Sequence, residues 1–224
     1  MKKGRDAGVP WDLIVTALEK WRRVLEGPSV GTVAEQYSRD PWAVLVSTIL
    51  SLRTKDEVTL VTSARLLEKA KSPAELDLLS EAAIAALAYP AGFYRTKAAN
   101  LKKIAAILLE KYDGSVPSDM DELLALPGVG RKTANLVLIE AFDLPGICVD
   151  VHVHRICNRA GWIQTRNPEE TEMTLREVLP RKYWKRINAL LVLYGQQVCR
   201  PVSPYCSRCV IAPHCGRNGV EKSR

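Results

Sequence analysis

The stretch LPGVGRKTAN at residues 126–135 decides the fold that this sequence predicts. Pro127 and the glycines after it make a tight connection of the kind that joins two antiparallel helices. Ser118 precedes the first of these helices. Because Asp121 follows three residues later, as in a capping box, we expect Ser118 to be the N-cap. The pattern therefore predicts a helix-hairpin-helix.

The hairpin turn has the chemistry of a phosphate-binding site. Two glycines let the backbone approach a phosphate closely, and the unpaired N–H groups and positive dipole end of the next helix attract phosphate oxygens. Such contacts hold DNA without reading its sequence. The residues expected to touch DNA here are Pro127, Gly128, Val129, Gly130 and Arg131. A hairpin that only packs also needs glycines, so the turn alone leaves binding and packing equally open.

Lys132 is a candidate nucleophile in the first turn of the second hairpin helix. The positive end of the helix dipole disfavours the protonated amine there, and partial burial would have the same effect. A neutral lysine can form a Schiff base with a carbonyl carbon. A lysine in a first turn is more often a solvated charge, so position alone does not make Lys132 catalytic.

Four cysteines near the C-terminus follow a C-x6-C-x2-C-x5-C spacing that ordinary core packing does not require; they are Cys199, Cys206, Cys209 and Cys215. Four thiolates suit tetrahedral zinc and an iron-sulfur cluster equally, so the spacing leaves the metal open. Residues 178–220 contain no Asp or Glu, and we expect Arg200 and Arg208 to meet phosphates there. Cys148 and Cys157 lie apart from the quartet and are expected to be small apolar core residues.

Composition excludes several classes of protein. The 224 residues are 47% hydrophobic, which is enough for one large globular domain or two small ones. The formal charge of +7 suits a nucleic-acid partner, although charge by itself is weak evidence. The longest apolar run, near residues 42–52, is far too short to span a membrane, and no secretion signal is visible. We therefore expect a cytoplasmic, nucleoid-associated protein with reduced thiols.

Most of the chain predicts helix, so the expected fold class is all-α. Asp40 and Pro41 form an N-cap and first turn before a fully buried helix. Further helices are expected at 58–69, 73–79, 80–87 and 96–111. The alternation in residues 149–154 indicates a strand by period alone. We favour a helix capped by Asp150, because an isolated strand would have no partner.

Three motifs in this order resemble the endonuclease III family of DNA glycosylases, the iron-sulfur branch of the helix-hairpin-helix superfamily. They are residues 126–135, the Val-Asp-Val-His sequence at 149–152 and the cysteine quartet. Residues 91–98 and 112–117 also match, and the likeness extends from Pro41 to Cys215. The resemblance implies two helical domains flanking a DNA-binding cleft: a central bundle of residues 34–144 and a cluster domain of residues 1–33 and 145–224.

The resemblance also implies a bifunctional enzyme of base excision repair. Lys132 would attack C1′ of a damaged nucleotide, expel the base and cleave the strand by β-elimination, with Asp150 as the assisting carboxylate. The four cysteines would hold a [4Fe-4S] cluster. The implied partner of this monomer is double-stranded DNA carrying oxidised pyrimidines or abasic sites.

Two positions depart from the family's commonest residues. Arg53 stands where a glutamine is usual, and Phe93 stands where an aliphatic residue is usual. By position both would fill the space left by the extruded nucleotide, although either could instead be a surface charge or a core aromatic. His152 would support the active site, and its alternative is an ordinary hydrogen-bonding side chain.

Three other functions remain open: an AP lyase with narrow glycosylase activity, a mismatch glycosylase without strand cleavage, and a non-catalytic iron-sulfur DNA-binding module. Lys132 argues against the mismatch glycosylase. A non-catalytic binding module would leave the pairing of Lys132 with Asp150 unexplained.

Overall fold

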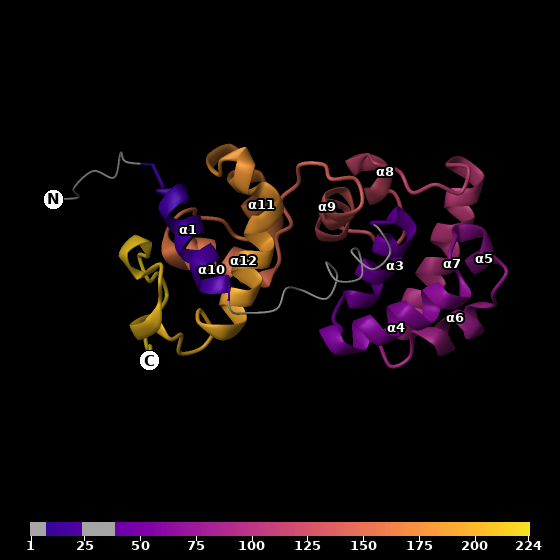
Figure 1. Cartoon of the computed structure of the whole chain (residues 1–224), viewed down its shortest axis with the longest axis horizontal. Coiled ribbons are helices and arrows are strands. Elements are labelled where there is room, and N and C mark those ends of the chain that lie inside the picture. The colour runs from indigo at the N-terminus through magenta and orange to yellow at the C-terminus, as the bar shows by residue number, and fades with distance from the viewer. Residues whose placement is uncertain (1–7, 24–38) are drawn as a thin grey trace. The chain divides into compact units, whose positions relative to one another are not determined.

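The computed structural model describes residues 8–23 and 39–224. Every regular element in these ranges is a helix, which confirms the all-α class (Figure 1). The chain divides into two compact units, one formed by Met1–Glu26 with Ile147–Arg224 and the other by Gly27–Gly146. We call the first the cysteine unit and the second the central unit. No helix within the described ranges has the length and apolar character needed to cross a membrane.

The central unit is built around one buried helix. Its helices are α3 (Pro41–Ser51), α4 (Asp56–Lys69), α5 (Pro73–Asp77), α6 (Glu81–Ala88), α7 (Tyr94–Lys111), α8 (Met120–Leu124) and α9 (Arg131–Glu140). Residues 42–50 of α3 are all buried, and α3 packs against α4, α7 and α9. The predicted helices at 58–69, 73–79, 80–87 and 96–111 are confirmed, with ends that differ by no more than two residues.

The N-caps of two helices show where local sequence was sufficient and where it was not. The Asp40 carboxylate accepts a hydrogen bond of 2.8 Å from the Ala43 N–H, as expected. The N-cap of α8 is Asp119, whose Oδ1 accepts from the N–H groups of Asp121 at 2.8 Å and Glu122 at 3.1 Å. The prediction of Ser118 as this cap is therefore wrong by one residue. A carboxylate oxygen can satisfy two of the helix's free N–H groups at once.

The cysteine unit joins segments that are far apart in the chain. Its elements are α1 (Trp11–Arg22), α10 (Val151–Ala160), α11 (Pro168–Val178), η1 (Arg181–Tyr183), α12 (Trp184–Gln197), η2 (Cys206–Arg208) and η3 (Ala212–His214). Helix α1 packs against α12, and the Trp11 ring meets the Trp162 ring edge-on with centroids 5.2 Å apart. Cys148 and Cys157 are fully buried, which confirms them as core residues.

Residues 151–160 form helix α10, which confirms the choice of helix over strand. The buried positions of α10 are Val153, Ile156, Cys157 and Ala160, a spacing that places them on one helical face. The valine alternation covered only the first turn, which is too short to separate a period of 2 from one of 3.6.

Candidate active site, DNA-contacting loops and cysteine centre

The hairpin turn between α8 and α9 holds its two glycines in different roles. Gly128 has a φ of +78°, a backbone conformation that favours glycine. Gly130 is the N-cap of α9 with extended backbone, and a methyl group added there would meet nothing within 4 Å. Val129 is buried, and its N–H donates to the Leu126 carbonyl at 3.1 Å. The turn is thus anchored by a buried side chain and leaves open space at Gly130.

Lys132 lies in the first turn of α9, two residues after Gly130. Its side chain is exposed. Thr133, Ala134 and Asn135, the next three residues, are buried in the central unit. The helix N-terminus therefore stays fixed while the Lys132 amine faces outward from the packed side of α9.

Asp150 is the N-cap of α10 in the cysteine unit, as predicted. Its Oδ1 accepts from the N–H groups of His152 at 2.9 Å and Val153 at 3.0 Å. Both bonds use one oxygen of the carboxylate, and the residue is partly exposed. The cap therefore orients the carboxylate, and a capping role is compatible with a chemical one.

His152 belongs to a network that connects α10 to the cysteine segment. Its Nδ1 lies 3.1 Å from Nη2 of Arg155, and the same guanidinium nitrogen donates to the carbonyls of Gly195 at 3.1 Å and Cys199 at 2.9 Å. Burial lowers the pKa of Arg155. The sequence did not single out Arg155, since its carbonyl acceptors lie 40 and 44 residues further along the chain.

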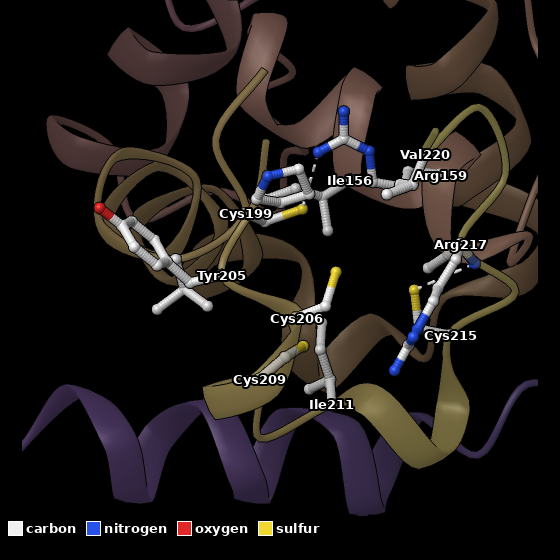
Figure 2. Close-up of a pocket in the computed structure, with 13 residues that line it drawn as sticks. Ile156, Arg159, Cys199, Tyr205, Cys206, Cys209, Ile211, Cys215, Arg217 and Val220 are labelled. Atoms are coloured by element: carbon white, nitrogen blue, oxygen red, sulfur yellow. Dashed lines mark hydrogen bonds between the residues drawn. The ribbon is translucent and has the colours of Figure 1, made fainter. Parts of the chain in front are cut away.

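The four cysteines of the quartet line one hollow in the cysteine unit. Figure 2 shows their sulfur atoms distributed around it, and the hollow has about 350 Å³ of empty volume including its open mouth. The structure thus brings together all four residues that the spacing predicted. Within the described ranges, no three His, Cys, Asp or Glu side chains are grouped closely enough to hold a single metal ion.

Hydrogen-bond donors surround the sulfur atoms of the hollow. Arg159 Nη1 donates to Cys199 Sγ at 3.3 Å, and the Tyr194 hydroxyl lies 3.1 Å from Cys209 Sγ. The Arg217 N–H donates to Cys215 Sγ at 3.4 Å. Burial raises the pKa of the Cys199 and Cys215 thiols. Donors placed in this way stabilise thiolates that bind a metal centre.

Arg200 and Arg208 gather at the ring of Tyr205 beside the hollow. Their guanidinium carbons lie 5.3 Å and 4.1 Å from the ring centroid, and Arg224 lies 5.2 Å from it. A hydrogen bond from Arg224, together with the nearby positive charges, lowers the pKa of Tyr205. Arg200 and Arg208 are both exposed, so the cluster presents positive charge at the surface.

Arg53 and Phe93 come together in the central unit, on two loops that are separate in the sequence. Both side chains are exposed, and the Arg53 guanidinium lies 5.5 Å from the Phe93 ring centroid. Both residues have left-handed backbone, with φ values of 52° and 57°. Phe93 is 62% exposed, which rules out the core-aromatic alternative.

Residues 46–181 match the sequence profile of a family described as "HhH-GPD superfamily base excision DNA repair protein". This match defines the class as a helix-hairpin-helix base excision repair protein. The chain is 48% identical over 176 residues to "Endonuclease III" of Thermotoga maritima, covering 79% of this chain and 83% of that protein. It is 46% identical over 183 residues to "Endonuclease III homolog 1, chloroplastic" of Arabidopsis thaliana, covering 78% of this chain and about half, 48%, of that longer protein.

A solved structure described as "Structure of a Trapped Endonuclease III-DNA Covalent Intermediate: Estranged-Adenine Complex" matches the fold with a TM-score of 0.78 and 31% identity. The match covers 92% of this chain and 95% of that one. The chain belongs to the endonuclease III family.

Proposed function

We propose that Lys132 and Asp150 perform the chemistry of this protein, which is an endonuclease III-type DNA N-glycosylase with AP lyase activity. The single observation that carries the proposal is the position of Lys132. The amine follows the glycine turn by two residues, on a helix N-terminus whose backbone N–H groups suit phosphate oxygens. A phosphate held at the turn would bring the sugar of the same nucleotide close to the Lys132 amine.

The reaction has two stages. The lone pair of the Lys132 Nζ forms a bond to C1′ as the glycosidic bond breaks, and the base leaves with that bond's electron pair and takes up a proton. The sugar ring then opens to give an imine between Nζ and C1′. Removal of a proton from C2′ expels the 3′ phosphate, which cuts the strand on the 3′ side of the lesion.

Asp150 has two tasks in this scheme. By the family resemblance, its carboxylate would help to deprotonate the lysine, which makes the amine nucleophilic, and would stabilise the positive charge that grows at C1′ as the base departs. The fixed geometry of the α10 cap supports the assignment, since a carboxylate held by two N–H groups needs little reorganisation.

The proposed substrates are duplexes that contain oxidised pyrimidines or abasic sites. The hairpin residues 127–131 bind the phosphate backbone, Arg200 and Arg208 add positive charge, and His152 supports the active site. Arg53 and Phe93 occupy the space of the extruded nucleotide, where arginine hydrogen-bonds the orphaned base and phenylalanine wedges between base steps. Rates on a panel of lesions for the parent protein and Arg53→Gln test this assignment, and identical profiles would contradict it.

The four cysteines of the quartet would hold a [4Fe-4S] cluster. Four sulfurs that line one hollow, but of which no three are grouped closely enough to hold a single metal ion, fit a cluster of several atoms better than one zinc ion, and the family resemblance favours iron. When bound, the cluster supplies structure rather than electron transfer, because no step of the lyase reaction needs an electron. It would hold the segment between Cys199 and Cys206 and so keep Arg200 at the surface.

Borohydride trapping tests the proposal. Reduction of the imine leaves a stable covalent link between Lys132 and an abasic duplex, so the parent protein should be trapped and Lys132→Ala should not, while its affinity for undamaged DNA remains. Lys103→Ala removes an exposed lysine from α7 of the same unit and should trap normally. Undiminished trapping of Lys132→Ala would remove Lys132 from its role. A base-removing enzyme without strand cleavage, or a non-catalytic binder, would fail to trap in any form.

A further inference from the structure

A buried lysine joins the two loops that carry Arg53 and Phe93. Lys97, in the first turn of α7, is only 5% exposed. Its Nζ donates to the carbonyls of Leu50 at 2.7 Å and Leu52 at 2.6 Å, and to the Thr54 hydroxyl at 2.9 Å. An ammonium group has three donors, and each of them is used. The two carbonyls lie at the C-terminal end of α3, where the helix dipole favours a positive charge.

The Thr54 hydroxyl extends this connection to the second loop. It accepts a hydrogen bond of 3.0 Å from the Gly92 N–H and donates to the Leu52 carbonyl at 3.2 Å. The two backbones are also in contact, since a Cβ atom added to Gly92 would lie 2.3 Å from the Arg53 carbonyl oxygen. Lys97, Thr54 and Gly92 therefore lock the loops against each other, and we call this group the Lys97 clamp.

The clamp explains how two strained residues persist side by side. Left-handed backbone is unfavourable for a residue with a side chain, and Arg53 and Phe93 both adopt it. Such conformations survive only where the surroundings hold them. Residue 53 lies between two positions bonded to Lys97, and residue 93 directly follows Gly92. The strain thus lies in the backbone of two residues whose side chains are exposed, and Lys97, which holds both loops, is buried.

We propose that Lys97 is a positioning residue whose buried ammonium presents Arg53 and Phe93 to the duplex as one preformed wedge. This inference rests on the proposed function, in which both side chains fill the space of an extruded nucleotide. A preformed wedge avoids the entropy of ordering two loops at the moment of binding, so it raises the affinity for a duplex with a missing base over an undamaged one.

The test uses full-length protein and a duplex containing a tetrahydrofuran abasic analogue opposite 2-aminopurine. Two quantities are measured: the ratio of affinities for this duplex and an undamaged one, and the fluorescence change of the 2-aminopurine on binding. Neither readout requires the lysine chemistry at position 132. The variants are Lys97→Met and Thr54→Val, with Thr54→Ser as the conservative rescue and Lys103→Met as the control on the same helix.

We expect Lys97→Met and Thr54→Val to lower the affinity ratio about tenfold, the size expected when a hydrogen bond to a charged group is lost. Both should also reduce the fluorescence change. Thr54→Ser keeps the hydroxyl and should retain the parent values, as should Lys103→Met. A ratio within twofold of the parent in both Lys97→Met and Thr54→Val overturns the proposal. An equal loss in Thr54→Val and Thr54→Ser overturns it too, because the hydroxyl would then be irrelevant.

Trapping on a single-stranded abasic oligonucleotide separates this inference from the proposed function. A single strand has no base pairs to open and no space for a wedge to fill. The yield of trapped Lys97→Met on the single strand should therefore equal that of the parent protein. If Lys97→Met is trapped less than the parent protein on the single strand, the variant has a general structural defect, and the positioning role is overturned. If the parent protein itself fails to trap, the lyase assignment fails, and the fluorescence readout still decides on the clamp.

Discussion

Alanine should have different effects at the two glycines of the hairpin: Gly128→Ala should lower the stability of the fold, whereas Gly130→Ala should weaken DNA binding. Gly128 has a φ of +78°, so an alanine there would cost about 1–2 kcal/mol in backbone strain. Its Cβ would also lie 2.3 Å from Nδ2 of Asn100. That atom ends a flexible side chain, which can rotate away and adds little to the cost. For a chain of this size the total corresponds to a fall in Tm of about 2–8 °C.

Gly130→Ala should leave stability nearly unchanged. The backbone there is extended, with a φ of −101°, and nothing lies within 4 Å of the added methyl group. Alanine restricts the unfolded chain more than glycine does, which stabilises the variant by about 0.4–1 kcal/mol. Alanine is also a poorer N-cap than glycine, which costs about the same, so the two effects offset each other. The methyl group would occupy the space where a phosphate oxygen approaches, so binding to undamaged DNA should weaken about tenfold, as for the loss of one hydrogen bond to a charged group.

Thermal unfolding by circular dichroism and fluorescence anisotropy with an undamaged duplex measure the two effects. Gly8→Ala, another glycine with open space around it, controls for the substitution itself. The reasoning is refuted if Gly130→Ala lowers Tm as much as Gly128→Ala, or if Gly130→Ala binds DNA as tightly as the parent protein.

Three further predictions follow from the cap, the clamp and the cysteines. Asp150→Asn should keep the N-cap and the stability of the parent protein, whereas Asp150→Ala should lose about 1 kcal/mol of stability, as urea midpoints would measure. Both variants should lower the initial rate of base removal at least a hundredfold. An active Asp150→Asn would contradict the chemical role of the carboxylate. Burial lowers the pKa of Lys97 from 10.5 to about 8, so the unfolded state binds more protons between these values and stability should rise with pH across that window. From pH 8 to 10.5 the free energy of unfolding of the parent protein should rise by roughly 1–2 kcal/mol relative to that of Lys97→Met, a value already reduced for solvent screening. A difference between the two proteins that does not change with pH would argue against the lowered pKa of Lys97. Cys206→Ser should abolish the visible iron-sulfur absorption and the bound iron, while Cys157→Ala should retain both.

The parts of this protein that local sequence predicted are those whose interactions span a few residues. The hairpin follows from a glycine turn, the caps at Asp40 and Asp150 from N–H groups two or three positions away, and the buried helix α3 from its apolar run. Even the error at Ser118 was local, because Asp119 offered a better acceptor one residue later. The cysteine quartet was also predictable, since its spacing has few uses other than metal binding.

The tertiary structure decided the roles that join distant segments. Lys97 stands at helical spacing from Leu101, Ile104 and Leu108, so it is a lysine on an otherwise buried helical face. Its hydrogen-bond partners, at the end of α3 and in the loop that follows, lie 43 to 47 residues earlier in the chain. Arg155 likewise finds its carbonyl acceptors 40 and 44 residues away. A buried charge is stable only where the folded chain supplies its acceptors, and no short-range pattern encodes which carbonyls those are.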